Sequence, residues 1–476
     1  MSPLRPSLAI LFSTACLWGC ALVGMDYRRP EAVNPPTGWH AALPHAGSGA
    51  RMTSWWEQFQ DQTLTRLIQA TLEQHPSLNA AQGAIEAARA ALTYQQSADQ
   101  PQARSAAQLQ RAGNSPNPTI ISSTSRSVAV DASWELDLFG RVKRATEGAE
   151  AKVAARQAEW HGLKISLASE TASLYNDHRA CTRLRDSLQE EVESRRASAQ
   201  ITRVATRAGL IAPADEAMVQ ARVADAQARL AAQEAECALS VKGLVALTGL
   251  DEPRLRAFLQ EAGHRPLVAP PLAVTTLPAR LLAQRPDLAA AEQELVSANA
   301  EIGVAEGARY PRFSLLGAVG AGVVTMGSVS QPNRPWNFGP ALSLPLLDGG
   351  AIEAGVRAAR ARHTMALANY RRGVQEAVRE VESALVNLEA VRLRVQETRA
   401  SARGAAAYRK AAEENLRTGG ISRLALEEAR RQHLEAERTV IQLEGREVQQ
   451  WINLYKSLGG GWESDTPSPQ PDQDPA

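Results

Sequence analysis

The chain repeats itself once, with a constant offset of 210 residues, and no other feature limits its fold as strongly. A pattern of Leu, Gln and Pro recurs in the same order in both halves: Leu67, Leu72, Gln74, Pro76 and Leu78 are matched by Leu277, Leu282, Gln284, Pro286 and Leu288. Three pairs of prolines or glycines keep this offset: Pro101 and Pro311, Gly140 and Gly350, Gly209 and Gly419. We therefore expect two tandem copies of one structural unit.

The two copies are expected to span 64–250 and 277–458. Between them, 251–276 is predicted to be a linker, because four prolines fall within 265–278. After the second copy, 459–476 starts with glycines and is then rich in Pro and Asp, a composition typical of disordered segments.

Apolar residues at seven-residue intervals predict long helices that pack in pairs. In copy one they are Val153, Trp160, Leu167, Leu174, Cys181 and Leu188, and then Val223, Leu230, Cys237 and Leu244. The stretch 141–207 contains no Pro, so as a helix it would be about 100 Å long at roughly 1.5 Å per residue. A second helix is expected after a break at 209–213. Copy two repeats both helices over 351–416 and 422–458, the last with a seam at Leu434, Ile441, Val448 and Tyr455.

Each copy also contains a stretch in which the period changes to two. After a first helix over 64–97, residues 127–138 alternate between apolar and polar, which predicts a strand with one dry face. Its weaker partner would be 102–111. In copy two, strands are expected over 313–324 and 336–347, joined by a loop that holds Gly327, Pro332, Asn333 and Pro335. Each copy thus offers one strand hairpin and one long helical hairpin.

Four strands cannot close a barrel, and open strand edges are not tolerated in lipid. Three chains would give twelve strands, each close to the roughly 9 to 11 residues that a tilted membrane strand needs. The expected fold is therefore an α+β membrane protein: a trimeric twelve-stranded transmembrane β-barrel, four strands per protomer, continued by a long periplasmic α-helical barrel.

The first residues are typical of a targeting signal. Arg5 precedes an apolar run over 8–17, which is too short to span a bilayer, so 1–19 is expected to be a signal peptide. The run ends at Cys20 in a sequence that resembles a lipobox, and lipidation there would place N-palmitoyl and S-diacylglycerol groups on a lipidated N-terminal segment, 20–63. Trp18 departs from that pattern, Cys16 is a rival acceptor, and a plain secretory signal is the alternative.

Several motifs together resemble the TolC-like outer-membrane efflux proteins, in particular the NodT-like lipoproteins of RND-type tripartite pumps. The motifs are LLAQRPDL at 281–288, ARYP at 308–311, WELDLFGR at 134–141 and LSLPLLDGG at 342–350. The resemblance implies a homotrimer that serves as an exit duct for drugs, metals or other small molecules. Its implied partners are a periplasmic adaptor, an inner-membrane transporter of RND type and outer-membrane lipids. In such lipoproteins an Asp after the acylated cysteine retains the protein in the inner membrane, and the residue after Cys20 is Ala21, which implies outer-membrane delivery.

The turns of the two helical hairpins contain Gly209 and Gly419, which can end a helix in the left-handed conformation, and Asp215 or Ser422 can start the next helix. On the residues alone these are simply turns. The resemblance implies that they dock the adaptor, through the tip residues Arg207, Gly209, Leu210, Gly419 and Ile421.

Just after the second tip, Leu424, Glu428 and Arg431 share one helix face at spacings of four and three residues. On spacing alone, Glu428 and Arg431 form a surface ion pair. The resemblance implies instead that the three residues form a periplasmic gate that pinches the tunnel shut, with Glu428 standing where Asp is usual.

Two cysteines lie at equal distances from the first tip. Cys181 is 28 residues before Gly209 and Cys237 is 28 residues after it, so in an antiparallel hairpin they lie at the same height. A disulfide is favoured in an oxidising periplasm, and two buried thiols are the alternative.

Other functional classes find little support. The net charge of +1, without a basic stripe, argues against a nucleic-acid partner. The sequence has no HExxH, GxxxxGK[ST] or GxSxG motif, so no enzyme, metal site or cofactor is expected. A lipid-anchored coiled-coil envelope scaffold without transport activity remains an alternative, as does a periplasmic enzyme on a helical stalk. The sequence does not identify the exported substrate.

Overall fold

The structure is a computed structural model that describes residues 23–30, 38–43, 52, 54–114, 121–263, 265–272 and 284–462. The chain divides into two compact units. Unit 1 comprises 1–31, 83–157 and 290–371, and unit 2 comprises 32–82, 158–289 and 372–476. Among the described residues, no helix is both long and apolar enough to cross a bilayer.

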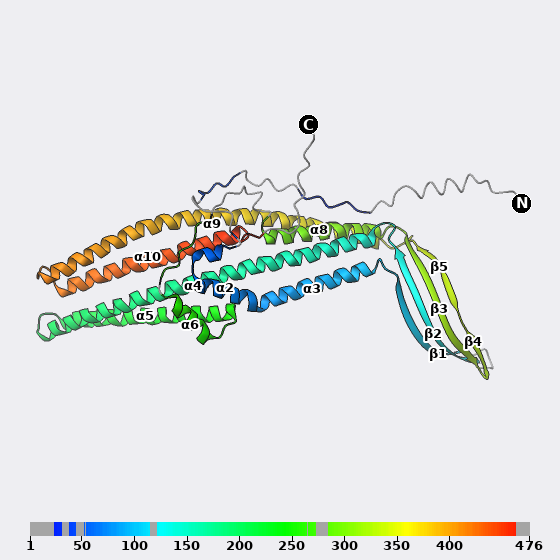
Figure 1. Ribbon diagram of the computed structural model, residues 1–476, viewed down its shortest axis with the longest axis horizontal. Coiled ribbons are helices and arrows are strands. Elements are labelled where there is room, and N and C mark those ends of the chain that lie inside the picture. The colour runs from blue at the N-terminus through cyan, green and yellow to red at the C-terminus, as the bar shows by residue number, and fades with distance from the viewer. Residues whose placement is uncertain are drawn as a thin grey trace, which may run out of the picture. The chain divides into compact units, whose positions relative to one another are not determined.

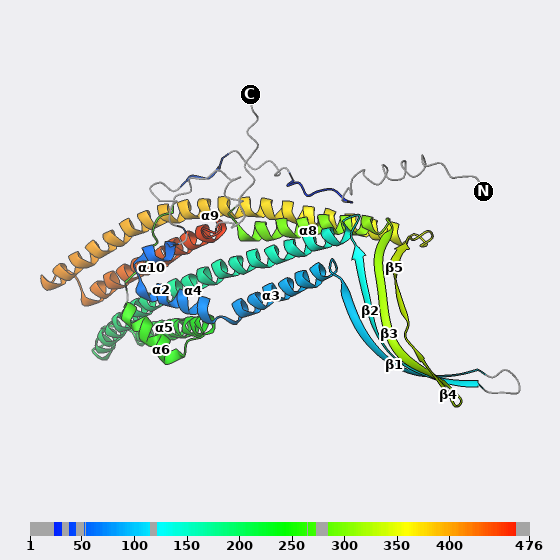
Figure 2. The ribbon, with the colours of Figure 1, turned by 45° about the vertical axis from the view of Figure 1, so that its right-hand side comes forward.

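Unit 1 contains an antiparallel sheet to which both copies contribute (Figure 2). The strands are β1 (Gln102–Asn114), β2 (Ile121–Leu136), β3 (Arg312–Met326), β4 (Val329–Asn333) and β5 (Trp336–Ser343). β1 pairs with β2, and β2 of copy one pairs with β3 of copy two, so the two hairpins form one sheet. The period-two alternation therefore predicted the strands, and β2 begins six residues earlier than expected.

The expected loop in the second hairpin contains a strand, so that part of the prediction is wrong. β4 turns back at Gly327, which has φ +58°, and pairs with Gly322–Met326, while β5 pairs with Arg312–Val319. The two short strands thus follow each other along one edge of β3. Proline has no N–H to give to a ladder, and Pro335 lies in the gap between β4 and β5, where its carbonyl still accepts from the Gly320 N–H at 2.9 Å.

The long helices agree closely with the heptad pattern. They are α4 (Arg141–Arg207), α5 (Pro213–Thr248), α9 (Ala351–Arg417) and α10 (Arg423–Ser457). Figure 1 shows α5 beside α4 and α10 beside α9 as far as the two tips. Seam residues from three of these helices are buried, as expected: Leu167, Cys181, Leu188, Val223, Cys237, Leu244, Leu434, Ile441, Val448 and Tyr455.

The expected first helix over 64–97 is two helices, α2 (Gln62–Gln74) and α3 (Pro76–Ser97). Between them His75 is extended, with ψ 123°. A residue before proline is disfavoured in the helical region, so Pro76 ends one helix and begins the next. In copy two, α8 (Pro286–Gly307) begins at the matching proline.

The core of unit 2 takes in segments to which the sequence assigned no structure. The short 3₁₀ helix η2 (Trp55–Phe59), from the expected N-terminal segment, buries Trp55 completely and stacks it on Tyr455 of α10, with 4.8 Å between ring centroids. The Trp55 indole N–H donates to the Pro270 carbonyl at 3.2 Å. Part of the expected linker is the helix α6 (Glu252–Ala262), whose Leu255 is buried in the same core. Much of the region between the copies is therefore a packed part of unit 2.

The start of the expected disordered tail is also packed, whereas 463–476 lie outside the described residues. Gly459 is buried with φ +82°, and a Cβ there would lie 2.3 Å from the Gln284 carbonyl oxygen. Gly209 at the first hairpin tip also has positive φ, +71°, but open space around it.

We predict that Gly459→Ala lowers the free energy of unfolding by several kcal/mol, about the 1–2 kcal/mol of a left-handed alanine plus the clash. Gly209→Ala, the control, should lose only the first contribution. Thermal unfolding of the two variants followed by circular dichroism would measure the difference. Equal losses would show that Gly459 is not packed.

Candidate gate and docking site

The two hairpin tips have the same backbone geometry. Gly209 and Gly419 have φ of +71° and +79°, a conformation that costs glycine little. The Leu210 N–H donates to the Ala205 carbonyl at 2.9 Å, and Gly420 donates to Asn415 at 2.8 Å. These bonds belong to Schellman motifs, so each tip closes on its own backbone.

The helices that leave the tips start in different ways. Ser422 is the N-cap of α10, and its side chain accepts from the Ala425 N–H at 3.2 Å, as predicted. The prediction for the first tip was wrong, because α5 begins at Pro213 after Ala212, and Asp215 lies in the first turn. There the acid can interact favourably with the helix dipole without capping the backbone.

The predicted docking residues differ in how much of their side-chain surface is exposed to a partner. Leu210 is 79% exposed, and Arg207 is exposed beside it. Ile421 is partly buried because it packs on a small cluster of α9 and α10 residues: Ala412, Leu426 and Ala429. Leu210 therefore provides the larger free apolar surface.

Arg431 and Glu428 come together as the spacing predicted, and the arginine also contacts a second helix. Its Nη2 lies 2.7 Å from Glu428 Oε2, and its Nη1 donates to the hydroxyls of Ser194 at 3.1 Å and Ser198 at 3.0 Å. Both serines are buried on α4. Arg431 thus links α10 of copy two to α4 of copy one. Leu424 lies one turn before Glu428 and is partly exposed.

The two charges have different surroundings. The Arg431 side chain is only 13% exposed, whereas the Glu428 side chain is 56% exposed. The hydrogen bond from Arg431 lowers the pKa of Glu428, and its positive charge adds to this against the opposing effect of partial burial. Glu428 therefore neutralises a largely buried guanidinium while it remains open to water.

Sequence reasoning missed the two serines. Ser194 is 237 residues from Arg431 in the chain, and Ser198 is 233 residues away. Serine is common on helices, and the heptad pattern identifies only apolar positions. No local signal could have selected them.

Cys181 and Cys237 form a disulfide, with their Cα atoms 5.6 Å apart. It joins α4 to α5, and both residues are buried. The two cysteines are equally far from Gly209 in the sequence, and this spacing correctly predicted that they lie at the same height in the hairpin. The two remaining cysteines, Cys16 and Cys20 near the expected signal peptide, lie outside the described residues.

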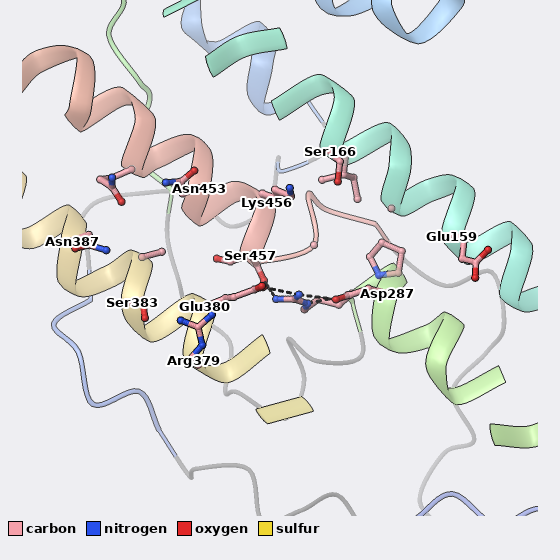
Figure 3. Close-up of a pocket in the computed structure, with 17 residues that line it drawn as sticks. Glu159, Ser166, Asp287, Arg379, Glu380, Ser383, Asn387, Asn453, Lys456 and Ser457 are labelled. Carbon is pink, nitrogen blue, oxygen red and sulfur yellow. Dashed lines mark hydrogen bonds and ion pairs between the residues drawn. The ribbon is translucent and has the colours of Figure 1, made fainter. Parts of the chain in front are cut away.

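A cavity of about 610 Å³ in unit 2 is lined by Arg285 of the LLAQRPDL motif and by other residues, among them Asp287, Glu380 and Ser457, which Figure 3 labels. Arg285 pairs with Asp287 at 2.7 Å and with Glu380 at 2.8 Å, and donates to the Ser457 carbonyl at 3.0 Å. Burial alone would lower the pKa of Arg285, but hydrogen bonds and charge from Asp287 and Glu380 raise it. Arg285 therefore stays charged. It connects the start of α8, the end of α10 and α9, so its role is structural.

The sheet of unit 1 carries apolar side chains on an open face. Val130, Val319 and Trp336 lie side by side across three strands, and all three are exposed. Val128 and Phe338 extend the same kind of surface. A continuous exposed apolar surface is typical of contact with lipid or another protein. In the part of the chain that the structure describes, no three His, Cys, Asp or Glu side chains are grouped so that they could hold a metal.

Comparison with known proteins gives consistent results. A family model described as outer membrane efflux protein matches residues 67–250 and 277–460. The chain is similar to the outer membrane protein OprJ of Pseudomonas aeruginosa, with 29% identity over 454 residues and 94% of each chain covered. It is also similar to the toluene efflux pump outer membrane protein TtgC of Pseudomonas putida, with 29% identity over 471 residues and 96% of each covered. The solved structure of the outer-membrane channel OprN superposes with a TM-score of 0.79 at 29% identity, over 92% of this chain and 99% of that one.

Proposed function

We infer that this chain, which belongs to the outer membrane efflux protein family, is an exit channel that works in a tripartite pump and is held closed near its periplasmic tips by Arg431. The chain is an outer-membrane efflux channel with the fold of that family. The gate, the adaptor and the transporter are the parts that we propose.

The observation that carries the gate is the contact of Arg431 with Ser194 and Ser198. It joins the two hairpins close to their tips, so the tips can separate only if a largely buried guanidinium loses two hydrogen bonds. Hydrogen bonds to charged groups are worth about 1.5–3 kcal/mol. A closed resting state follows, and an adaptor that binds the tips can offset this cost when the pump assembles.

The functional unit that we propose is a homotrimer. One protomer leaves the outer edges of β1 and of β4 and β5 without a partner strand in the described sheet. Unpaired edges are costly in lipid, and three sheets joined edge to edge would close them in one twelve-stranded barrel. The exposed row of Val130, Val319 and Trp336 would then face lipid.

We further propose that acyl chains on Cys20 hold the chain to the outer membrane, and that a periplasmic adaptor and an inner-membrane transporter of RND type complete the pump. The name of TtgC assigns toluene efflux to that relative. Small apolar molecules are therefore a reasonable first substrate class for this channel, with choice among them left to the transporter.

Channel activity is tested by reconstitution of the purified protein in planar bilayers. We expect a heat-modifiable trimer with discrete conductance steps. A monomer that gives no steps would favour the lipid-anchored scaffold instead.

Docking is tested at the first tip. Leu210→Asp should weaken binding of the pump's adaptor at least about tenfold, because the exposed leucine would lose its apolar contact and a charge would be buried. Leu239→Asp, at a residue of α5 that is also exposed but lies 29 residues from Leu210, is the control. Affinity would be measured by surface plasmon resonance on trimers. Equal affinities of the two variants would contradict docking at this tip.

A further inference from the structure

Glu191 is a buried carboxylate at a point in unit 2 where three helices meet. Its side chain is 3% exposed. One oxygen lies 3.1 Å from Arg195 on the same helix, α4, and 3.3 Å from Arg229 on α5. The other oxygen lies 3.0 Å from Arg438 on α10. One carboxylate therefore holds guanidinium groups from three helices.

The charges around Glu191 balance. Arg229 also pairs with Asp225 at 3.0 Å, and Arg438 also pairs with Glu435. Three carboxylates thus face three guanidinium groups. Glu191 Oε1 accepts hydrogen bonds from Arg195 and Arg229, whereas Oε2 has no hydrogen bond and is balanced only by the charge of Arg438. A buried carboxylate is costly unless it is paired, so Glu191 depends on its arginines more than they depend on it.

The contact of Glu191 with Arg438 repeats the gate contact at a different height. Arg438 follows Arg431 by seven residues, or two helical turns, so both lie on one face of α10. On α4, Ser194 and Ser198 follow Glu191 by three and seven residues and share one face in the same way. α4 runs toward the first tip, and α10 runs away from the second tip. Glu191 precedes the two serines on α4 and Arg438 follows Arg431 on α10, so the Glu191 contact lies farther from the tips than the Arg431 contact.

We propose that Glu191 is a positioning residue of the gate, which holds α10 against α4 through Arg438 and so keeps the channel closed behind the Arg431 contact. This inference rests on the proposed gate. The two contacts differ in kind. Arg431 can exchange serine hydroxyls for water, whereas separation at Arg438 exposes a dry carboxylate that keeps only two of its three cations. The Glu191 contact therefore limits how far an opening that starts at the tips can extend along α10.

Two substitutions separate this role from general loosening of the helices. Arg438→Gln and Arg229→Gln each remove one cation from Glu191 and leave the other two in place. Arg438 joins α4 to α10, while Arg229 joins α4 only to α5, to which the Cys181–Cys237 disulfide already ties it.

The experiment measures single-channel conductance and open probability of reconstituted trimers. We expect Arg438→Gln and Glu191→Gln to raise the open probability about tenfold, Arg229→Gln to stay within about twofold of the parent, and Glu191→Asp to restore much of the closure that Glu191→Gln loses. If Arg438→Gln does not assemble, Arg438→Met fills a similar volume without charge and should give the same rise.

Parent-like conductance of the Arg438 variants would overturn the inference, and so would an equal rise in Arg229→Gln. The combined Glu428→Ala and Arg431→Ala variant, measured alongside, tests the gate itself. If it opens while the Arg438 variants stay closed, only the role of Glu191 fails. If it stays closed too, the proposed gate fails.

Discussion

Replacement of Glu428 and Arg431 together by Ala should raise the open probability of the reconstituted channel about tenfold or more, with a matching rise in mean conductance. The double variant removes the two hydrogen bonds from Arg431 to α4 and the ion pair that neutralises it. At about 1.5–3 kcal/mol for a hydrogen bond to a charged group, loss of even one would shift the balance between closed and open states by a factor of ten or more. Planar bilayer recordings measure both quantities.

A matched control lies on α9 near the same tip. Glu414 and Arg417 form an exposed pair at the same spacing of three residues, 3.2 Å apart. Their replacement by Ala should leave conductance unchanged, because exposed pairs contribute little. Unchanged conductance of the Glu428 and Arg431 variant would sink the gate assignment.

Acid should act in the same direction as the substitution. The pKa of Glu428 is lowered from 4.5 by its hydrogen bond from Arg431, so the pair is complete above pH 4.5 and is lost as the pH falls through the lowered pKa. The parent channel should open in acid, and the double variant should respond less.

Loss of the disulfide should have the second large effect. Replacement of Cys181 and Cys237 by Ser should lower the free energy of unfolding of the α4–α5 hairpin by about 4 kcal/mol, the value expected for a loop of this length. The two cysteines are 56 residues apart in the sequence, so the bridge removes much freedom from the unfolded hairpin. Hydrogen exchange of the backbone amides of α4 and α5 near the first tip would report the loss.

Reduction of the parent protein provides the control, because it should bring its exchange rates to those of the variant. The amides of α9 and α10 near the second tip, which this disulfide does not bridge, should change less. Equal exchange in the oxidised parent and the variant would contradict a stabilising role. Alkylation of Cys181 or Cys237 without reductant, seen as a mass shift, would contradict the bridge itself.

The long helices could be predicted almost to the residue because their signal is local and repeated. Leu167, Leu188 and Leu244 each belong to a seven-residue series, and a series of several members is hard to misread. The Glu428 and Arg431 pair was predictable for the same reason, since side chains three residues apart on a helix are always neighbours. The partners of Arg431 on α4 depend on how helices from two copies pack, which the spacing within one helix does not encode.

The errors have a common physical origin. β4 has five residues, too few for an alternating pattern, and its pairing is decided by β3. Trp55 and α6 were missed because their burial depends on a core made by α2, α5, α9 and α10 together. Pro76 was a visible signal for a helix break, but the apolar pattern on both sides concealed it.

The interrupted edge formed by β4 and β5 matters before the protein reaches its membrane. Pro332 and Pro340 lie along this edge, and neither has an N–H to offer to a neighbouring strand. Before it assembles with other subunits, a newly exported chain therefore has one sheet edge that pairs poorly with other strands. Such an edge discourages uncontrolled pairing with the sheets of other proteins. Because of the same prolines, this edge can make fewer main-chain hydrogen bonds to a neighbouring subunit than β2 makes to β3. The contacts between subunits should therefore be the first to dissociate on heating or in detergent.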